Sequence, residues 1–139
     1  EDFGNGIIRA PKDTLIDGMS VLTFAISRPP KSIQQMIDDY NIDVNTDIDY
    51  FLIHQANKLI VDRVVKKLKL PTEKVPYDLE EFGNLGGASI PSLMVTRIAE
   101  PMRNNQPIKM LCSSFGLGLS WGTMLITANN VIIPELIEI

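Results

Sequence analysis

The chain has 139 residues, of which 45% are hydrophobic and 22% charged, and its net charge is −4. This length and composition predict one globular domain with a core of its own, and the acidic balance argues against a general binder of nucleic acid. The apolar runs are shorter than the roughly 20 residues of a membrane helix and the first residues are polar, so we expect a cytoplasmic protein that does not span a membrane.

Hydrophobic periodicity and the positions of proline and glycine predict helices and strands that alternate along the chain. The predicted elements in chain order are an irregular lead-in over 1–17, helices over 18–26 and 33–40, a strand over 50–53, a helix over 55–70, a weak strand over 75–77, a helix over 87–101, strands over 108–112 and 123–127, and a tail over 129–139. Pro29 and Pro30 separate the first two helices, which therefore form one kinked helix or two short ones.

This alternation predicts an α/β fold, with helices on both faces of a mixed sheet, in a single domain over 1–139. The last two strands are joined by a short turn, so we expect them to be antiparallel. A complete unit begins with a strand before the first helix, and we expect that strand upstream of these residues.

Three segments carry groups suited to chemistry. His54 begins the sequence His-Gln-Ala-Asn at a junction from strand to helix, where open α/β sheets bind ligands. Asn84 lies in a glycine-rich turn before a helix, and residues 115–119 form a glycine-rich bend whose amides can face an anion. Each segment alone also has a structural interpretation, as a hydrogen-bonded histidine, a turn-forming asparagine and a tight strand connection.

Together, the three motifs resemble the carboxyl-terminal half of the β-ketoacyl-acyl-carrier-protein synthase III family. They are His-Gln-Ala-Asn from residue 54, Gly-Asn from residue 83 with Ala-Ser-Ile-Pro from residue 88, and Phe-Gly-x-Gly-x-Ser-Trp-Gly from residue 115, with 30 residues between His54 and Asn84. The resemblance covers about residues 17–128. It implies half of a layered, thiolase-like fold, whose missing amino-terminal half supplies a nucleophilic cysteine.

The implied activity is the decarboxylative Claisen condensation of an acyl-coenzyme A primer with malonyl-acyl-carrier protein in fatty acid biosynthesis. Coenzyme A thioesters and the phosphopantetheine arm are substrates, and no cofactor is implied. Loss of carbon dioxide leaves an enolate with a negative oxygen, which two hydrogen-bond donors stabilise. The residues assigned by the resemblance are His54 and Asn84 as those donors, the backbone amide of Leu117 for an oxyanion, Asn57 and Phe115 for the pantetheine arm, and Lys66 and Lys67 for docking the carrier protein.

The cysteine and the basic residues have weaker interpretations. Cys112 is the one cysteine, but it lies in a predicted strand and not at a helix start, so we expect it to be buried and the nucleophile to lie upstream. One cysteine and one histidine also argue against a metal site. Five bases and Asp62 give residues 58–69 a local charge of +4, which indicates either a solvated face or a docking surface for an acidic protein.

Two alternatives remain at this point. The first is a related acyltransferase or condensing enzyme of secondary metabolism or polysaccharide modification. The second is a non-catalytic thiolase-fold half that serves docking or dimerisation. In either case we expect a homodimer, and we expect the helix over 87–101 to present Ile90, Leu93, Met94 and Ile98 to the amino-terminal half.

Overall fold

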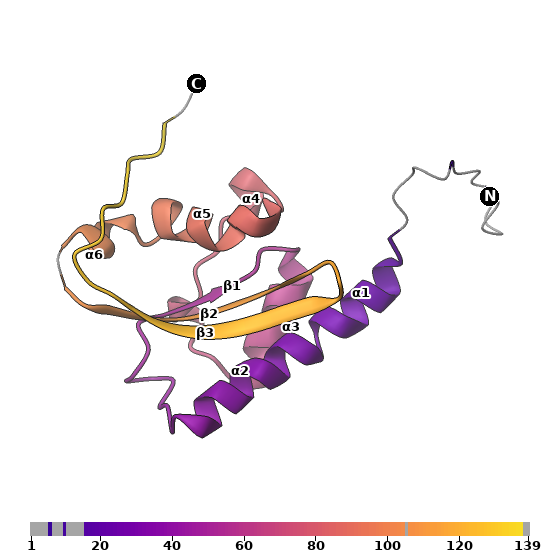
Figure 1. The fold of residues 1–139 in the computed structure, drawn as a ribbon, viewed down its shortest axis with the longest axis horizontal. Coiled ribbons are helices and arrows are strands. Elements are labelled where there is room, and N and C mark those ends of the chain that lie inside the picture. The colour runs from indigo at the N-terminus through magenta and orange to yellow at the C-terminus, as the bar shows by residue number, and fades with distance from the viewer. Residues whose placement is uncertain (1–5, 7–9, 11–15, 105, 138–139) are drawn as a thin grey trace.

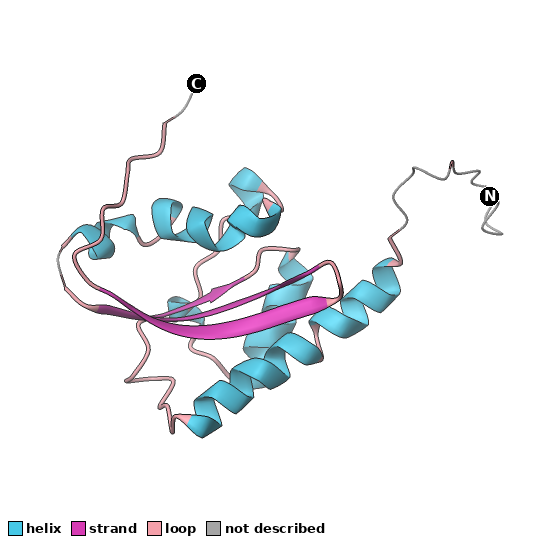
Figure 2. Cartoon of the chain, in the orientation of Figure 1, coloured by secondary structure: helices cyan, strands magenta, loops and turns pink. Residues whose placement is uncertain are grey.

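The computed structural model describes residues 6, 10, 16–104 and 106–137. Most of the predicted lead-in therefore lies outside the described residues. The elements in chain order are α1 (Gly18–Ala25), α2 (Arg28–Asp39), β1 (Tyr50–Ile53), α3 (Lys58–Leu68), the 3-10 turn η1 (Thr72–Lys74), α4 (Leu79–Phe82), the 3-10 turn η2 (Gly86–Ala88), α5 (Ser89–Thr96), α6 (Ala99–Arg103), β2 (Ile108–Gly116) and β3 (Ser120–Ala128). Figure 2 shows how these helices and strands are distributed.

The three strands form a mixed sheet with helices on both faces, as predicted. The strand order is β1-β2-β3. The central strand β2 is parallel to β1 and antiparallel to β3. Helices α1, α2 and α3 cover one face, and α4, α5 and α6 lie over the other (Figure 1). Successive side chains of a strand point to opposite faces, so Phe51 and Leu111 join the core under α1 to α3, while Leu52 and Cys112 join the core under α5 and α6.

The first helical region consists of two helices that run end to end. The Asp17 carboxylate caps α1 by accepting from the backbone amides of Met19 and Ser20, each at 3.1 Å. Ile26 and Ser27 follow, and α2 then begins with Pro29 and Pro30 in its first turn. Proline costs little there, because the first amides of a helix have no partner within the helix.

Three local predictions were wrong. Residues 75–77 do not form a strand: Pro76 has no amide to donate, and the Tyr77 carbonyl accepts from Nε of Arg97 at 2.7 Å. The helix over 87–101 is divided into η2, α5 and α6, and Pro101 lies in the first turn of α6, where its missing amide is tolerated. Helical periodicity predicts an apolar stripe of Leu59, Ile60, Val64 and Leu68 on α3, but Leu59 is exposed and Val61 is buried in its place.

The expected partner-facing side of the helix over 87–101 also needs correction. Leu93 and Ile98 are fully buried against the chain's own sheet, in the same core as Leu52 and Met110. Ile90 and Met94 are half-buried at the edge of that core. This apolar face is therefore used inside the chain. Exposed apolar side chains occur instead on β3 and on the bend before it, among them Leu117, Trp121 and Met124.

Candidate active site

His54 lies directly after β1 and is held by the sheet. Its backbone amide donates to the Ser113 carbonyl at 2.9 Å, which extends the pairing of β1 with β2 by one residue. The side chain is 7% exposed, and its ring meets the Phe115 ring edge-to-face with centroids 4.9 Å apart. Burial lowers the pKa of His54, so the imidazole is neutral at pH 7.

The two ring nitrogens of His54 differ in access. Nδ1 is buried and has no hydrogen-bond partner among the described residues. Nε2 is then the nitrogen that a bound molecule can reach. A neutral imidazole carries one N–H, and it acts as a hydrogen-bond donor to such a molecule when that proton is on Nε2.

Asn84 lies in the turn between α4 and α5. Gly83 and Gly86 on either side have positive φ angles of 65° and 58°, which favour glycine. The Asn84 side-chain oxygen accepts from the Gly86 amide at 2.9 Å, and this bond orients the side chain. Its amide nitrogen makes no hydrogen bond to the described part of the chain, so its two N–H groups are available as donors.

The bend between β2 and β3 contributes backbone. Leu117 is 94% exposed, and its carbonyl accepts from the Ser120 hydroxyl at 2.7 Å. Gly118 has a φ of 133°, and a Cβ atom at this position would lie 3.0 Å from the Ser120 nitrogen. Glycine is therefore required at Gly118. The leucine side chain has no polar atom, so Leu117 can give the site a hydrogen bond only through its backbone.

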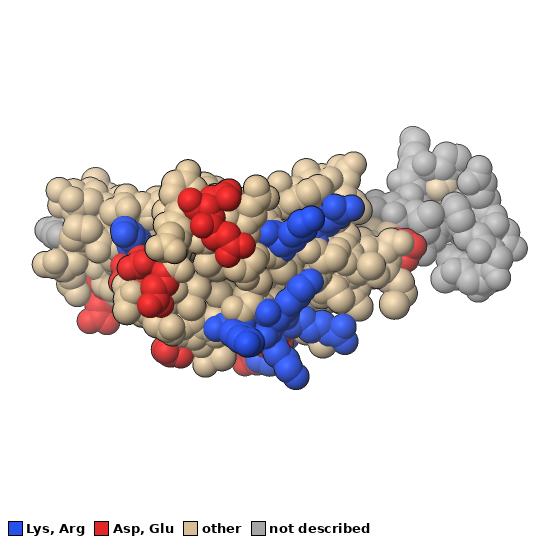
Figure 3. All heavy atoms as spheres, turned by 90° about the horizontal axis from the view of Figure 1, so that it is seen from below, with Lys and Arg blue, Asp and Glu red and all other residues tan. Residues whose placement is uncertain are grey.

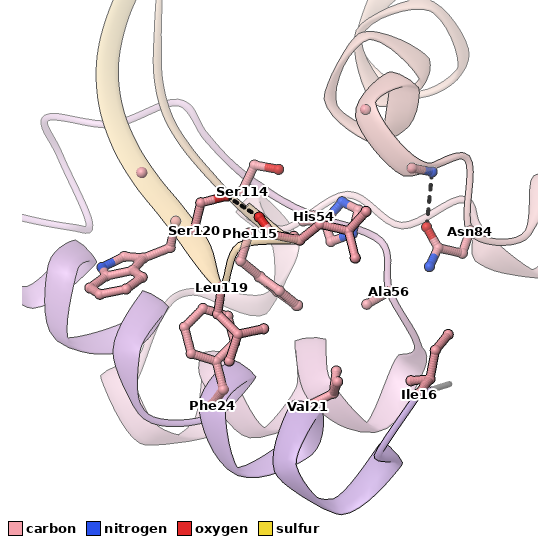
Figure 4. A pocket seen from close by; sticks show the side chains of 16 residues that line it. Ile16, Val21, Phe24, His54, Ala56, Asn84, Ser114, Phe115, Leu119 and Ser120 are labelled. Atoms are coloured by element: carbon pink, nitrogen blue, oxygen red, sulfur yellow. Dashed lines mark hydrogen bonds between the residues drawn. The ribbon is translucent and has the colours of Figure 1, made fainter. Parts of the chain in front are cut away.

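These segments meet at one hollow of about 720 Å³ (Figure 4). His54, Asn84, Phe115 and Leu117 all line it, although they come from three separate parts of the chain. Apolar side chains make up most of the remaining wall. Four that the sequence analysis did not assign to the site are Ile16, Val21, Phe24 and Trp121.

Phe24 joins α1 to the floor of this hollow. Its ring packs edge-to-face on Phe115, at 6.0 Å, and on Trp121, at 5.5 Å between centroids. The Arg28 guanidinium lies 6.0 Å from the centroid of the Trp121 ring, and Trp121 is 45% exposed. The aromatic wall thus runs from His54 to solvent. The sequence predicts a helix over 18–26, but it does not reveal which strand residues Phe24 meets.

Asn57 and the basic pair lie outside the hollow. The Asn57 side chain caps α3 by accepting from the Ile60 amide at 2.9 Å, and the neighbouring Ala56 lines the hollow in its place. Lys66 and Lys67 are exposed on α3, and together with Arg63 and Ile26 they line a shallow depression. Nζ of Lys67 donates to the Ile26 carbonyl at 3.0 Å. On the face seen in Figure 3, several lysine and arginine side chains form a cluster right of the centre, and another basic group lies apart from it on the left.

Comparison with known proteins agrees with this geometry. Residues 39–128 match the family described as 3-oxoacyl-[acyl-carrier-protein] synthase III C terminal. The chain belongs to this family. It is 42% identical over 115 residues to the beta-ketoacyl-[acyl-carrier-protein] synthase III of Streptococcus pneumoniae (strain Hungary19A-6), an alignment that covers 81% of this chain and 35% of that protein.

Two solved structures show the same fold. The 3-oxoacyl-(acyl-carrier protein) synthase of Burkholderia xenovorans LB400 superposes with a TM-score of 0.84 at 29% identity, over 91% of this chain and 36% of that one. The priming beta-ketosynthase of the R1128 polyketide biosynthetic pathway gives 0.71 at 27% identity, over 83% and 34%. The thiolase-like fold class is thereby confirmed, and the chain spans little more than a third of the length of these relatives.

Cys112 is buried in β2, as predicted. Burial raises the pKa of its thiol to about 11, so it is protonated at pH 7 and unsuited to act as a nucleophile. Among the described residues, histidine, cysteine and carboxylate side chains form no group of three or more that could hold a metal ion. Within that same part of the chain, each helix is too short or too polar to cross a membrane.

Proposed function

We propose that this chain is the carboxyl-terminal catalytic part of a 3-oxoacyl-[acyl-carrier-protein] synthase III. The complete enzyme would condense an acyl-coenzyme A primer with malonyl-acyl-carrier protein in fatty acid biosynthesis. The observation that carries the proposal is that His54 and Asn84, 30 residues apart in the sequence, line one hollow whose other walls are mostly apolar. Family membership and the 42% identity to the Streptococcus pneumoniae synthase support it.

The decarboxylation step follows from these two side chains. The bond between the malonyl carboxylate and the methylene carbon breaks, carbon dioxide leaves, and the electron pair moves into the thioester as an enolate. His54 Nε2–H and the Asn84 amide donate hydrogen bonds to the negative oxygen. A neutral imidazole suits this role, and the apolar walls favour loss of a charged carboxylate by removing water from it.

The condensation step requires a group from outside this chain. The enolate carbon attacks the acyl thioester on a nucleophilic cysteine, and the carbon–sulfur bond of that thioester breaks to release the thiolate. We propose that the Leu117 backbone amide stabilises the oxyanion of this acyl-enzyme chemistry. Phe115 lies against His54 and lines the hollow, so it would contact the end of the pantetheine arm, and Asn57 would contact the arm nearer the surface.

The partners follow from the same assignment. An acidic acyl carrier protein would dock on the exposed Lys66 and Lys67, and an amino-terminal half would complete the site. A homodimer in the cytoplasm is the form we propose for the complete enzyme.

A second candidate function uses the same chemistry and differs only in the pathway that provides the substrates. The structural likeness to the priming beta-ketosynthase of the R1128 pathway favours a condensing enzyme of secondary metabolism that uses the same two donors. A non-catalytic docking module is disfavoured, since such a module has no use for two donors that face an apolar hollow.

The test uses a joined synthase, in which this chain replaces the matching carboxyl-terminal part of the Streptococcus pneumoniae relative. Products formed from malonyl-carrier protein with short acyl-coenzyme A primers are measured by mass spectrometry. A 3-oxoacyl-carrier product confirms the activity, and the preferred primer distinguishes the two candidates. If the joined synthase is folded and yet forms neither a condensation product nor acetyl-carrier protein, the proposed function is wrong.

A further inference from the structure

Asp78 is a buried carboxylate that has no place in the decarboxylation chemistry. It is 1% exposed and lies immediately before α4. Its Oδ2 atom accepts a hydrogen bond from the Ser92 hydroxyl at 2.5 Å and a longer one, at 3.2 Å, from the Thr96 hydroxyl, which shares its proton with the Ser92 carbonyl at 2.8 Å. Both hydroxyls are on α5, one helical turn apart. Burying a carboxylate is costly unless it is hydrogen-bonded, so these two contacts fix the residue on α5.

The segment that Asp78 begins is the one that carries Asn84. The Asp78 carbonyl accepts from the Glu81 amide at 3.1 Å and from the Phe82 amide at 3.0 Å, which starts the single turn of α4. Gly83 and then Asn84 follow directly. The segment rejoins α5 through Ser89, whose hydroxyl donates to the Gly86 carbonyl at 3.0 Å. In Figure 1, α4 lies beside the start of α5.

The turn needs such an anchor because its own backbone is permissive. Gly83 and Gly86 both have positive φ angles, and apart from their chain neighbours no described residue comes within 4 Å of where a Cβ would be on either. The side chain of Asn84 bonds within its own turn, to Gly86, and so does not tie the turn to the sheet that carries His54. The Asp78 contact closes a loop across 14 residues and thereby restricts where the turn can lie.

A second contact on the same segment is exposed. Nη2 of Arg97 pairs with Glu81 at 2.7 Å, with the two side chains 31% and 59% exposed. Exposed ion pairs contribute little to order, because water and salt screen them and their long side chains lose entropy on pairing. Nε of Arg97 also donates to the Tyr77 carbonyl at 2.7 Å, which holds the backbone just before Asp78. Between Asp78 and Asn84, the buried Asp78 contact is therefore the main tie of the turn to α5.

We infer that Asp78, through Ser92 and Thr96, is a positioning residue that holds Asn84 at the distance from His54 that the reaction requires. The inference rests on the proposed function, because it takes Asn84 to be a donor to the enolate. A donor displaced by about 1 Å loses much of its effect on rate, and binding of the substrate elsewhere in the site is unchanged. Asp78 would thus act on kcat rather than on KM.

The first test measures the order of the Asn84 side chain by NMR relaxation of its Nδ2 in the 139-residue chain. Asp78→Ala should lower the order parameter of Asn84 well below that of the α5 amides and leave His54 as ordered as before. The double variant Ser92→Ala, Thr96→Val removes the same contact from the α5 side and should give the same result. It keeps the test valid if Asp78→Ala does not fold. Glu81→Gln, which removes the exposed ion pair, is the matched control and should change nothing.

The second test measures decarboxylation in the joined synthase. Asp78→Ala should lower kcat about 10-fold to 100-fold with KM unchanged, and Asp78→Asn, which keeps one side-chain oxygen, should restore part of the rate. In an Asn84→Ala background, the Asp78 substitution should cause no further loss.

The outcomes separate the two ideas. Losses that multiply in the double variant, or an Asn84 side chain equally ordered without the Asp78 contact, would overturn the positioning role. If Asn84→Ala alone leaves decarboxylation unchanged, the proposed function is wrong at Asn84, and the relaxation measurement still decides whether Asp78 orders the turn.

Discussion

The exposed lysine pair on α3 gives a quantitative prediction about recognition. Under the proposed docking, reversal of Lys66 or Lys67 to glutamate would replace attraction to an acidic carrier protein by repulsion. Two unit charges 4 Å apart in water interact by about 1 kcal/mol, so the double reversal changes the docking energy by about 4 kcal/mol before screening. Salt and side-chain entropy reduce exposed pairs to a fraction of that, and we expect KM for malonyl-carrier protein to rise about 10-fold to 100-fold.

The structure distinguishes the two lysines. Nζ of Lys67 donates to the Ile26 carbonyl at 3.0 Å and so joins α3 to the break between α1 and α2. Lys67→Glu should therefore also lower the melting temperature, while Lys66→Glu should not. Lys109→Glu is the matched control, because Lys109 is exposed near the start of β2, at the end of the sheet away from His54.

The assay is steady-state kinetics of the joined synthase from about 0.05 to 0.5 M salt, with malonyl-carrier protein and with malonyl-pantetheine. The defect should be confined to the carrier substrate and should shrink as salt rises, since the Debye length falls from 10 Å at about 0.1 M to a few ångströms. A defect that is independent of salt, or that is equal for the small thioester, would refute docking on this pair.

Three further predictions concern the chain by itself. Incubated with acyl-coenzyme A and malonyl-carrier protein, it should form no 3-oxoacyl product, because its one cysteine is buried with a pKa of about 11; such a product would show that the nucleophile has been misplaced. Its free energy of unfolding should fall as pH decreases below about 6.5, because the native state lowers the pKa of His54 and the unfolded chain therefore binds the proton more readily. Urea unfolding between pH 7.5 and 5 measures this loss, which should disappear in His54→Gln. It should self-associate at micromolar concentration through the apolar side chains exposed on β3, and Met124→Glu should shift sedimentation towards the monomer, whereas a wild-type chain that is already monomeric would contradict this.

Much of the geometry of the candidate site was predictable because it depends on local features. The apolar run that ends at Ile53 predicted a strand, and a residue that follows a strand lies at the edge of the sheet, where His54 is found. The glycines around Asn84 and after Phe115 predicted the two turns. The grouping of these segments at one hollow came from the family resemblance, because spacing alone does not say which strand ends are adjacent.

What the sequence missed depends on contacts between distant residues. Phe24 is an ordinary core position of α1 in the sequence, and its packing on Phe115 and Trp121 emerges only when α1 lies across the sheet. In the sequence Asp78 has the character of a turn residue. Its buried hydrogen bond to Ser92 joins positions 14 residues apart, and local sequence patterns do not predict such a contact. The strand expected over 75–77 failed for the same kind of reason, because the Tyr77 carbonyl is engaged by Arg97 and not by another strand.

The central claim is that His54 and Asn84 stabilise the enolate formed by decarboxylation, and the most direct measurement is carbon dioxide release from malonyl-carrier protein by the joined synthase. His54→Ala and Asn84→Ala should each slow release by about 10²-fold to 10³-fold, as loss of one oxyanion donor does elsewhere. Asn104→Ala, which removes an exposed asparagine outside the hollow, should leave the rate unchanged. Release at the wild-type rate by a folded His54→Ala or Asn84→Ala variant would contradict the role given to that residue.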